Sequence, residues 1–212
     1  MSTIANAGTK KNEKQRTGTN VRKLTMTAML SAIAFILMFL DFSIPIMPTF
    51  IKMDLSELPA LIGAFAMGPI SGVTICLVKN LLHLFITSTG GVGELSNFIL
   101  GAIFVLPAGV VYRKWHNRKG ALIGSFVGAV LMGLMSIPSN YFIVYPVYYN
   151  FMPKELILGA YQAIFSGVDS ILDCLVLFNM PYTFVKGLFS VIITFLVYKH
   201  ISPIIKGARD SR

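Results

Sequence analysis

Lys186 is the one charged residue in FNMPYTFVKGLFSVIITFLVY, an otherwise apolar or mildly polar stretch at residues 178–198. A charged side chain within a membrane costs at least a few kcal/mol, so it usually has a partner or a function. Asn140, in SIPSNYFIVYPVYYN, is a similar case because an amide inside a bilayer needs a hydrogen-bonding partner. With about 1.5 Å of rise per residue, the two side chains fall at a similar depth.

Asn140 and Lys186 together offer hydrogen-bond donors and an acceptor at one level, beside several tyrosines. This composition suits a planar aromatic ligand with polar edges. Two plainer interpretations stay open. Lys186 could extend to the outer membrane interface, and the tyrosines could form an interfacial aromatic belt, which is what we expect of Tyr148 and Tyr149.

The sequence carries no motif for catalysis or nucleotide hydrolysis. It contains no GxxxxGK[ST], no HExxH and no CxxC. Its three histidines are scattered, and nothing resembles a Ser-His-Asp order. We therefore expect no catalytic residues, no metal site and no cofactor. If ATP drives this protein, another subunit hydrolyses it.

The composition is that of a membrane protein. Hydrophobic residues make up 55% of the 212 residues and charged residues 13%, against about 25% charged in soluble domains. The long apolar runs match the roughly 20 residues that one helix needs to cross a bilayer, whereas a β-barrel needs short alternating segments. The sequence predicts an all-α membrane protein. Residues 1–23 are polar and basic, which favours a disordered tail.

Six apolar segments are candidate spans within a transmembrane domain at residues 24–203. They lie at residues 24–44, 58–66, 70–86, 95–112, 121–145 and 181–198. The second is too short to cross alone, and GPISG separates it from the third, so the two predict a hairpin with one short limb. Residues 150–179 are amphipathic and carry two aspartates, and we interpret them as an outer interfacial segment.

The distribution of charge predicts the orientation. Of the 18 basic residues, 14 lie in the N-terminal tail, in the loop RKWHNRK or at the C-terminus. Six spans place these regions on one face, which the positive-inside rule makes cytoplasmic. Both termini, including the tail at 204–212, are therefore predicted in the cytoplasm. The net charge of +9 describes this face, and no nucleic-acid module is visible.

The loop after the first span, FSIPIMPTFIKMDLSELP, is apolar for a loop that faces water. Pro45 and Pro48 break the helix there. Such a loop either packs on the bundle or covers an apolar ligand, and insertion into the membrane surface is the alternative. In the third span, Lys79 is expected to pair with Asp54, Glu57 or Glu94 rather than to contact a ligand.

Several of these segments together resemble the substrate-binding S components of energy-coupling factor (ECF) vitamin transporters, specifically the riboflavin-specific type. The resemblance covers most of residues 24–199. Its motifs are IPIMPTFIKMDLSELPALIGAFAMGPISG, VKNLLHLF with GVGELSNFILGA, SNYFIVYP and MPYTFVKGL.

The resemblance implies six helices in a prokaryotic cell membrane, with riboflavin bound as transported substrate near the outer surface, under the first loop. It implies that an AxxxA face on the first helix, matched by Ala28 and Ala32, docks a coupling subunit that carries two ATPases. Packing within the chain is the other use of such a face. In similar proteins the asparagine of the NYF motif and the lysine of the PFNxxKG motif bind the isoalloxazine ring. These are Asn140 and Lys186 here. Thr183 stands where the family usually has asparagine, and its hydroxyl has a shorter reach.

The candidate substrate site contains residues from both arguments. It comprises Asn140, Lys186, Thr183, Met47, Thr49, Phe50, Tyr141, Tyr145 and Glu94. Three alternatives remain: an S component for another vitamin such as thiamin, whose positive charge disfavours a lysine at the ring; a self-sufficient secondary transporter, although no repeat pair or ion relay is visible; and a membrane enzyme, although no nucleophile–base set is apparent.

Overall fold

A computed structural model of the chain describes the backbone of residues 2–87 and 89–207 and the side chains of residues 20–87 and 89–196. Within this part, five helical segments are long and apolar enough to cross a membrane, and a sixth apolar helix is shorter. The long segments are Asn20–Met38, Pro69–Ile86, Val92–Lys114, Arg118–Tyr148 and Ile171–Leu196. The short one is α2, Glu57–Met67. The predicted all-α membrane architecture is confirmed.

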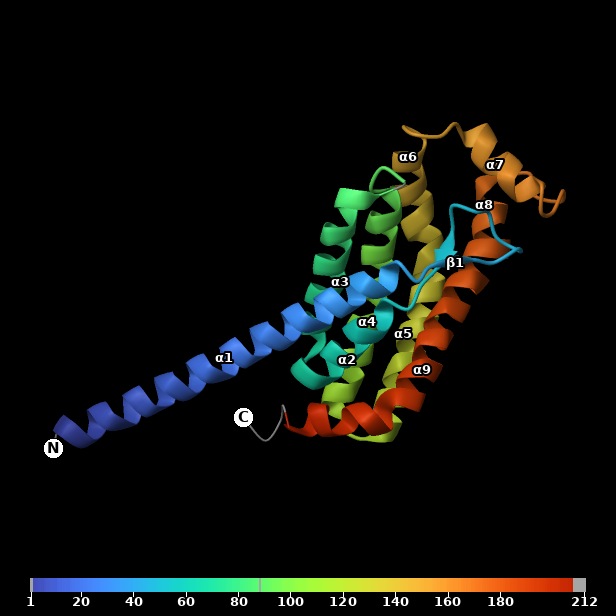
Figure 1. The fold of residues 1–212 in the computed structure, drawn as a ribbon. Helices are drawn as coiled ribbons and strands as arrows, with labels where there is room; N and C mark the ends of the chain where they lie inside the picture. Colours follow the sequence, from blue (N-terminus) through green and yellow to red (C-terminus); the bar gives the residue numbers. More distant parts are fainter. Residues whose placement is uncertain (1, 88, 208–212) are drawn as a thin grey trace.

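Helix α1 runs from Ser2 to Met38 and projects beyond the rest of the bundle (Figure 1). Residues 2–23, for which the sequence predicts disorder, are helical in this structure. The segment contains no proline, the residue that disfavours a helix most strongly, and the helix of the apolar span continues through it. Residues 208–212 of the predicted C-terminal tail lie outside the described residues.

The α1–α2 loop, residues 39–56, contains a short antiparallel ribbon. Strand β1, Phe42–Ser43, pairs with β2, Lys52–Met53, so that Phe42 faces Met53 across the ribbon. An ion pair between Lys52 Nζ and Asp41 Oδ2, at 3.0 Å, closes its open end. The ribbon encloses the two prolines at which the sequence predicts a break in the helix.

Helices α2 and α3 form the predicted hairpin with one short limb. Helix α3 extends over Pro69–His83, and a single 3-10 turn, η1, follows at Leu84–Ile86. Gly68 makes the turn at φ 102°, a conformation that glycine adopts without strain. Pro69 then occupies the first turn of α3, where a missing N–H costs nothing.

The next two spans are longer than the predicted 95–112 and 121–145. Helix α4, Val92–Lys114, leads to α5, Arg118–Ser139, whose first turn is capped by the Asn117 side chain. A π-helical segment, η2 at Asn140–Val144, and α6 at Tyr145–Tyr148 continue α5 without a break. The helix therefore extends through Tyr141, Tyr145 and Tyr148 and ends before Tyr149.

The predicted interfacial segment is shorter than 150–179. Helix α7, Lys154–Gln162, is a separate short helix, but α8, Ile171–Cys174, and the π-helical η3, Leu175–Asn179, continue directly into α9, Met180–Gly207. Asp173 caps the start of α8 through Ser170, so a charge that reads as an interruption of the span marks its beginning.

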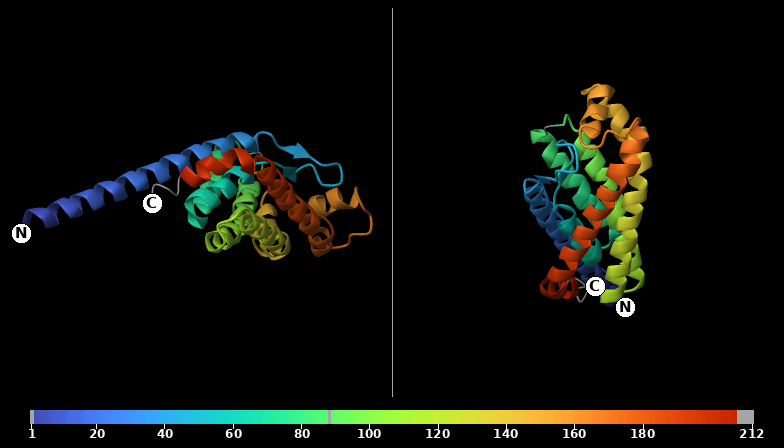
Figure 2. Two further views of the ribbon diagram at one scale, coloured as in Figure 1. Left: turned by 90° about the horizontal axis from the view of Figure 1, so that it is seen from below. Right: turned by 90° about the vertical axis from the view of Figure 1, so that its right-hand side faces the viewer.

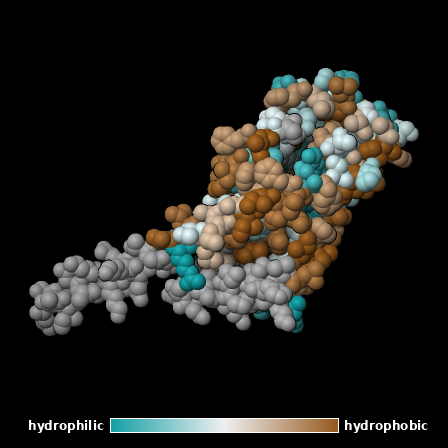
Figure 3. Space-filling view, viewed as in Figure 1, coloured by the Kyte–Doolittle hydropathy of each residue, from teal (hydrophilic) through white to brown (hydrophobic). Residues whose placement is uncertain are grey.

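The helices form one bundle in which α4 packs between α3 and α5, and α9 packs on α5 and α2 (Figure 2). The ends of α1 and α9 that carry the termini lie at one end of the bundle, and the ribbon and α7 lie at the other, which we call the loop end. Apolar side chains cover the flank of the bundle in Figure 3, and hydrophilic ones gather at the loop end. Which end faces the cytoplasm remains a prediction from charge.

An ion pair lies within the apolar bundle. Lys79 Nζ on α3 is 2.8 Å from Glu57 Oε1 on α2, and both side chains are 0% exposed. The predicted pairing of Lys79 with one of three carboxylates is confirmed for Glu57. Since a charge buried without a partner is strongly unfavourable, each of these residues requires the other.

We predict that Lys79→Met lowers the free energy of unfolding by about 3–5 kcal/mol, because Glu57 then stays buried and unpaired. The double variant Lys79→Met, Glu57→Leu should recover most of the loss. Thermal unfolding in detergent measures both, with Lys154→Met on the exposed start of α7 as control. A double variant no more stable than the single one would contradict the pairing argument.

Candidate functional site

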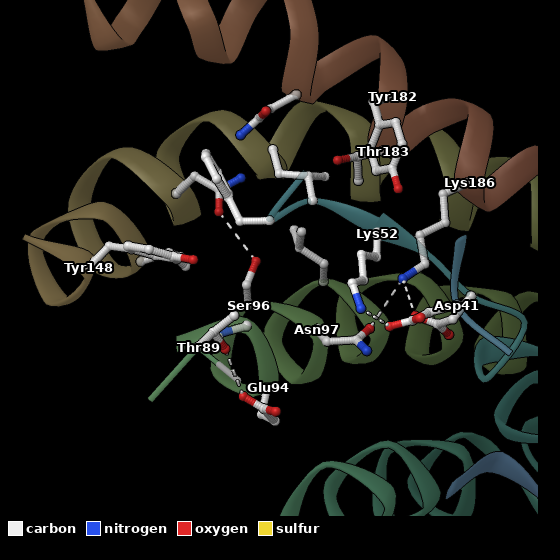
Figure 4. Close-up of a pocket in the computed structure, with 18 of the residues that line it drawn as sticks. Asp41, Lys52, Thr89, Glu94, Ser96, Asn97, Tyr148, Tyr182, Thr183 and Lys186 are labelled. Carbon is white, nitrogen blue, oxygen red and sulfur yellow. Dashed lines mark hydrogen bonds and ion pairs between the residues drawn. The ribbon is translucent and has the colours of Figure 1, made fainter. Parts of the chain in front are cut away.

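A cavity of about 410 Å³ opens at the loop end, between the α1–α2 loop and helices α4, α5–α6 and α9 (Figure 4). This volume falls in the range of about 300–1,000 Å³ that is usual for small-molecule sites. Seven of the nine predicted site residues line it: Thr49, Phe50, Glu94, Asn140, Tyr145, Thr183 and Lys186.

At the end of the cavity nearest the bundle centre, Lys186 meets the α1–α2 loop. Its Nζ donates to Asp54 Oδ2 at 2.9 Å and to Asn97 Oδ1 at 3.5 Å, and Lys186 is only 8% exposed. Burial raises the pKa of Asp54, but Lys186 and Lys79 outweigh it and hold that pKa below its usual range. Asp54 is therefore an ionised carboxylate. It pairs with Lys186, which lies 132 residues further along the chain.

The same carboxylate connects the cavity to the buried pair below it. Asp54 Oδ1 accepts hydrogen bonds from the backbone N–H and hydroxyl of Ser56. Lys79, already paired with Glu57, also donates to the Ser56 hydroxyl. A continuous polar chain thus runs from Lys186 to Glu57 through an otherwise apolar interior.

Asn140 faces the cavity from the start of the π-helical η2. Its Oδ1 accepts from Ser96 Oγ on α4 at 3.3 Å, and Thr183 lies one turn before the lysine level on α9. Asn140 and Lys186 therefore line the same cavity. Their contact with a ligand stays a prediction.

An aromatic wall occupies the end of the cavity nearest the surface. Tyr145 and Tyr148 have ring centroids 6.4 Å apart, and Phe50 of the loop packs 5.7 Å from Tyr148. Tyr148 was expected in an interfacial belt, yet it lines the cavity. Ligand rings could stack against this wall, which lies beside the polar groups.

Glu94 lines the cavity, but protein groups occupy its oxygens. Oε1 is 2.6 Å from His83 Nδ1, and Oε2 accepts from the hydroxyls of Thr87 at 2.9 Å and Thr89 at 3.2 Å. The carboxylate thereby ties the end of α3, and the turn that follows it, to the first turn of α4.

Two predicted residues lie outside the cavity lining. Tyr141 is 44% exposed and packs against Phe142, because one helical step beyond Asn140 turns the side chain by about 100°. Met47 is buried within the loop but does not line the cavity.

Sequence reasoning missed several lining residues. Asn97, Asn179 and Tyr182 line the cavity. Asn97 lies three residues after Glu94, and Asn179 lies seven before Lys186, so helical spacing from selected residues would have found both. The Tyr182 hydroxyl is buried and has no hydrogen-bond partner within the described chain. The part of the chain whose side chains are described contains no group of histidine, cysteine and acidic residues that could hold a metal.

The fold and this cavity define a membrane protein that holds a small molecule between helices and a covering loop. Residues 22–198 match the family described as "ECF transporter, substrate-specific component". The chain belongs to this family, and it is a multi-pass cell-membrane protein.

Relatives support the same assignment. The riboflavin transporter FmnP of Bacillus subtilis is 31% identical over 90% of this chain and 97% of that protein. The riboflavin transporter RibU of Staphylococcus aureus is 31% identical over 87% of this chain and 93% of that protein. A solved structure described as the S component of a bacterial ECF transporter superimposes with a TM-score of 0.69 at 30% identity, covering 88% of this chain and 99% of that one.

We predict that Glu94→Gln loosens the turn at residues 87–91, because an amide cannot accept all three hydrogen bonds. Hydrogen bonds to a charged group contribute about 1.5–3 kcal/mol, so backbone deuterium exchange in this turn should rise about 10-fold or more. Glu155→Gln, at an exposed position on α7, is the matched control. Unchanged exchange at 87–91 would show that Glu94 does not hold the turn.

Proposed function

We propose that the chain binds riboflavin in the cavity and serves as the substrate-binding subunit of an ATP-driven uptake transporter. The observation that carries this proposal is the composition of the cavity wall. Buried amides and a lysine stand beside an aromatic surface, in a chain related over most of its length to riboflavin transporters. A flavin needs such a combination, because its ring is planar and only part of its edge is polar.

In this proposal the polar edge of the flavin ring faces Asn140 and Lys186, with Thr183 beside them. Asn140 can donate through its amide nitrogen and can also accept through its oxygen, since Ser96 uses only one of the two lone pairs. Lys186 remains paired with Asp54, and the ammonium group can use a further proton for the ligand. The ring then lies against Tyr145 and Tyr148.

The α1–α2 loop would cover the bound flavin. Thr49 and Phe50 at its tip line the cavity, and Asp54 anchors its far end to Lys186. The pair of Lys52 and Asp41 is partly exposed, and an exposed pair contributes little stability. The loop can therefore open at the ribbon while its anchor stays in place.

Transport would require partners. The chain lacks a nucleotide-binding motif, so the proposal includes a membrane coupling subunit and two ATPase subunits. Ala28 and Ala32 are exposed on α1, so they are not used for packing within the described chain and are available to the coupling subunit. The loop end would then face outward and the termini the cytoplasm, as the basic residues indicate.

Titration of the detergent-purified protein with riboflavin tests the binding proposal. We expect saturable one-to-one quenching of flavin fluorescence. Asn140→Ala and Lys186→Ala should each weaken binding about 10- to 100-fold, the effect of losing about 1.5–3 kcal/mol. Because Lys186→Ala also leaves Asp54 unpaired, Lys186→Ala combined with Asp54→Asn separates ligand contact from loop anchoring.

Tyr141→Phe is the control, since Tyr141 lies outside the cavity lining and should leave the affinity unchanged. No quenching by a folded parent protein would exclude riboflavin as the ligand. If the parent binds and both alanine variants bind equally well, the ligand does not contact Asn140 and Lys186.

The docking proposal has a separate test. Ala28→Leu and Ala32→Leu enlarge a face that small residues leave open to close helix approach. We expect riboflavin binding to stay at the parental level and ATP-driven uptake to fall at least about 10-fold in vesicles that contain the coupling and ATPase subunits. Met29→Leu, an exposed neighbour of similar volume, is the control. Parental uptake by both leucine variants would contradict docking at this face.

A further inference from the structure

Asn179 is a cavity residue that the proposed contacts leave unused. It is the last residue of the π-helical η3, is only 6% exposed and lines the cavity. Thr183 and Lys186 follow it at i+4 and i+7 in the same continuous helix, so the three share one face. Proteins often place a π-helical turn at a functional site, and the other one in the described chain begins with Asn140.

A closed ring of hydrogen bonds holds the Asn179 side chain. The Tyr161 hydroxyl donates to Asn179 Oδ1 at 2.7 Å, and Asn179 Nδ2 donates to the Tyr145 hydroxyl at 3.2 Å. The two hydroxyl oxygens are 2.7 Å apart. Since Tyr161 uses its one proton on Asn179, Tyr145 must donate to Tyr161, and the ring runs in one direction.

The ring leaves part of the amide free for a ligand. An asparagine side chain has two N–H donors and an oxygen with two lone pairs. The ring uses one N–H and one lone pair, and it would do so equally if the amide were turned over and the ring reversed. One N–H and one lone pair therefore remain, on a side chain that lines the cavity.

The support comes from outside the spanning helices. Tyr161 lies on α7, is 0% exposed and does not line the cavity. Its ring packs 6.2 Å from Phe50 and 5.5 Å from Phe178, measured between centroids. Burial raises the pKa of Tyr161 well above its usual value, so the hydroxyl keeps the proton that it donates.

We infer that Asn179 is a third hydrogen-bonding contact for the polar edge of the bound ring, and that Tyr161 is the positioning residue that fixes its amide. This inference rests on the proposed function, because the ligand is the flavin of that proposal. It gives α7 a role in ligand recognition, because Tyr161 on this helix holds the Asn179 side chain without lining the cavity itself.

Two variants test this inference in the full-length protein. Asn179→Leu removes the amide at similar volume, and Tyr161→Phe removes one hydroxyl but keeps the ring. We expect riboflavin affinity to fall at least about 10-fold in the first and by a smaller factor in the second, as expected for losing one hydrogen bond and for loosening it. Both variants should shift the visible absorption band of bound flavin, which responds to hydrogen bonding at the ring. Asn150→Leu and Tyr149→Phe, at exposed positions, are the controls.

The spectrum distinguishes contact from general damage. If both variants bind riboflavin more weakly but leave the absorption band unchanged, the hydrogen bonds among Tyr145, Tyr161 and Asn179 have only a structural role. That result would overturn the inference. Parental affinity and spectrum in Asn179→Leu would also overturn it, while leaving the proposed function intact. Absence of riboflavin binding by the parent protein would overturn both. If Asn179→Leu does not fold, Tyr161→Phe decides alone, since it removes only one oxygen atom.

Discussion

The pairing of Lys186 with Asp54 joins two parts of the chain that would otherwise have no reason to meet. A lysine inside an apolar bundle requires a carboxylate, and here the carboxylate comes from the α1–α2 loop rather than from a neighbouring helix. Asp54 in turn continues through Ser56 to the buried pair of Lys79 and Glu57. These ion pairs fix the end of the loop that precedes α2, because removing one charge would leave its partner buried and unpaired. The cavity begins next to this fixed end.

The two ends of the cavity are held by different means. Near the bundle centre, charged groups from α2, α3, α9 and the loop converge, and every one of them depends on another for its burial. Near the surface, neutral hydroxyls and amides are held by α6, α7 and η3, as in the ring of Tyr145, Tyr161 and Asn179. Neutral groups can exchange partners with a ligand at little cost, whereas the charged chain cannot. Ligand exchange is thus expected to disturb the surface end while the charged end keeps the loop in register.

Much of this arrangement follows from the sequence. Apolar runs and charge predicted the spans, and isolated polar residues within them predicted that Asn140 and Lys186 share a site. Three features could not be predicted. The partner of Lys186 is 132 residues away, and the sequence gives no distance between them. The π-helical turns leave no mark in an apolar pattern with a 3.6-residue period. Asp173 was interpreted as a break in the span although it caps the start of α8, and this placed Asn179 in an interfacial segment rather than in the cavity wall.

Helix α2 has only 11 residues, which at about 1.5 Å per residue span about 16 Å, roughly half of a hydrocarbon core of about 30 Å. The chain that leads into it is the largely non-helical backbone of the α1–α2 loop, residues 39–56. Backbone of this kind is tolerated at membrane depth only when it is covered by protein or faces water. Residues 49–52 and Asp54 of the loop line the cavity, so the cavity would give this backbone access to water until a ligand takes its place. On binding, the ligand would replace water as the hydrogen-bonding partner of these peptide groups. A ligand that fills the volume without polar atoms for the loop would leave them unpaired and would bind weakly for that reason.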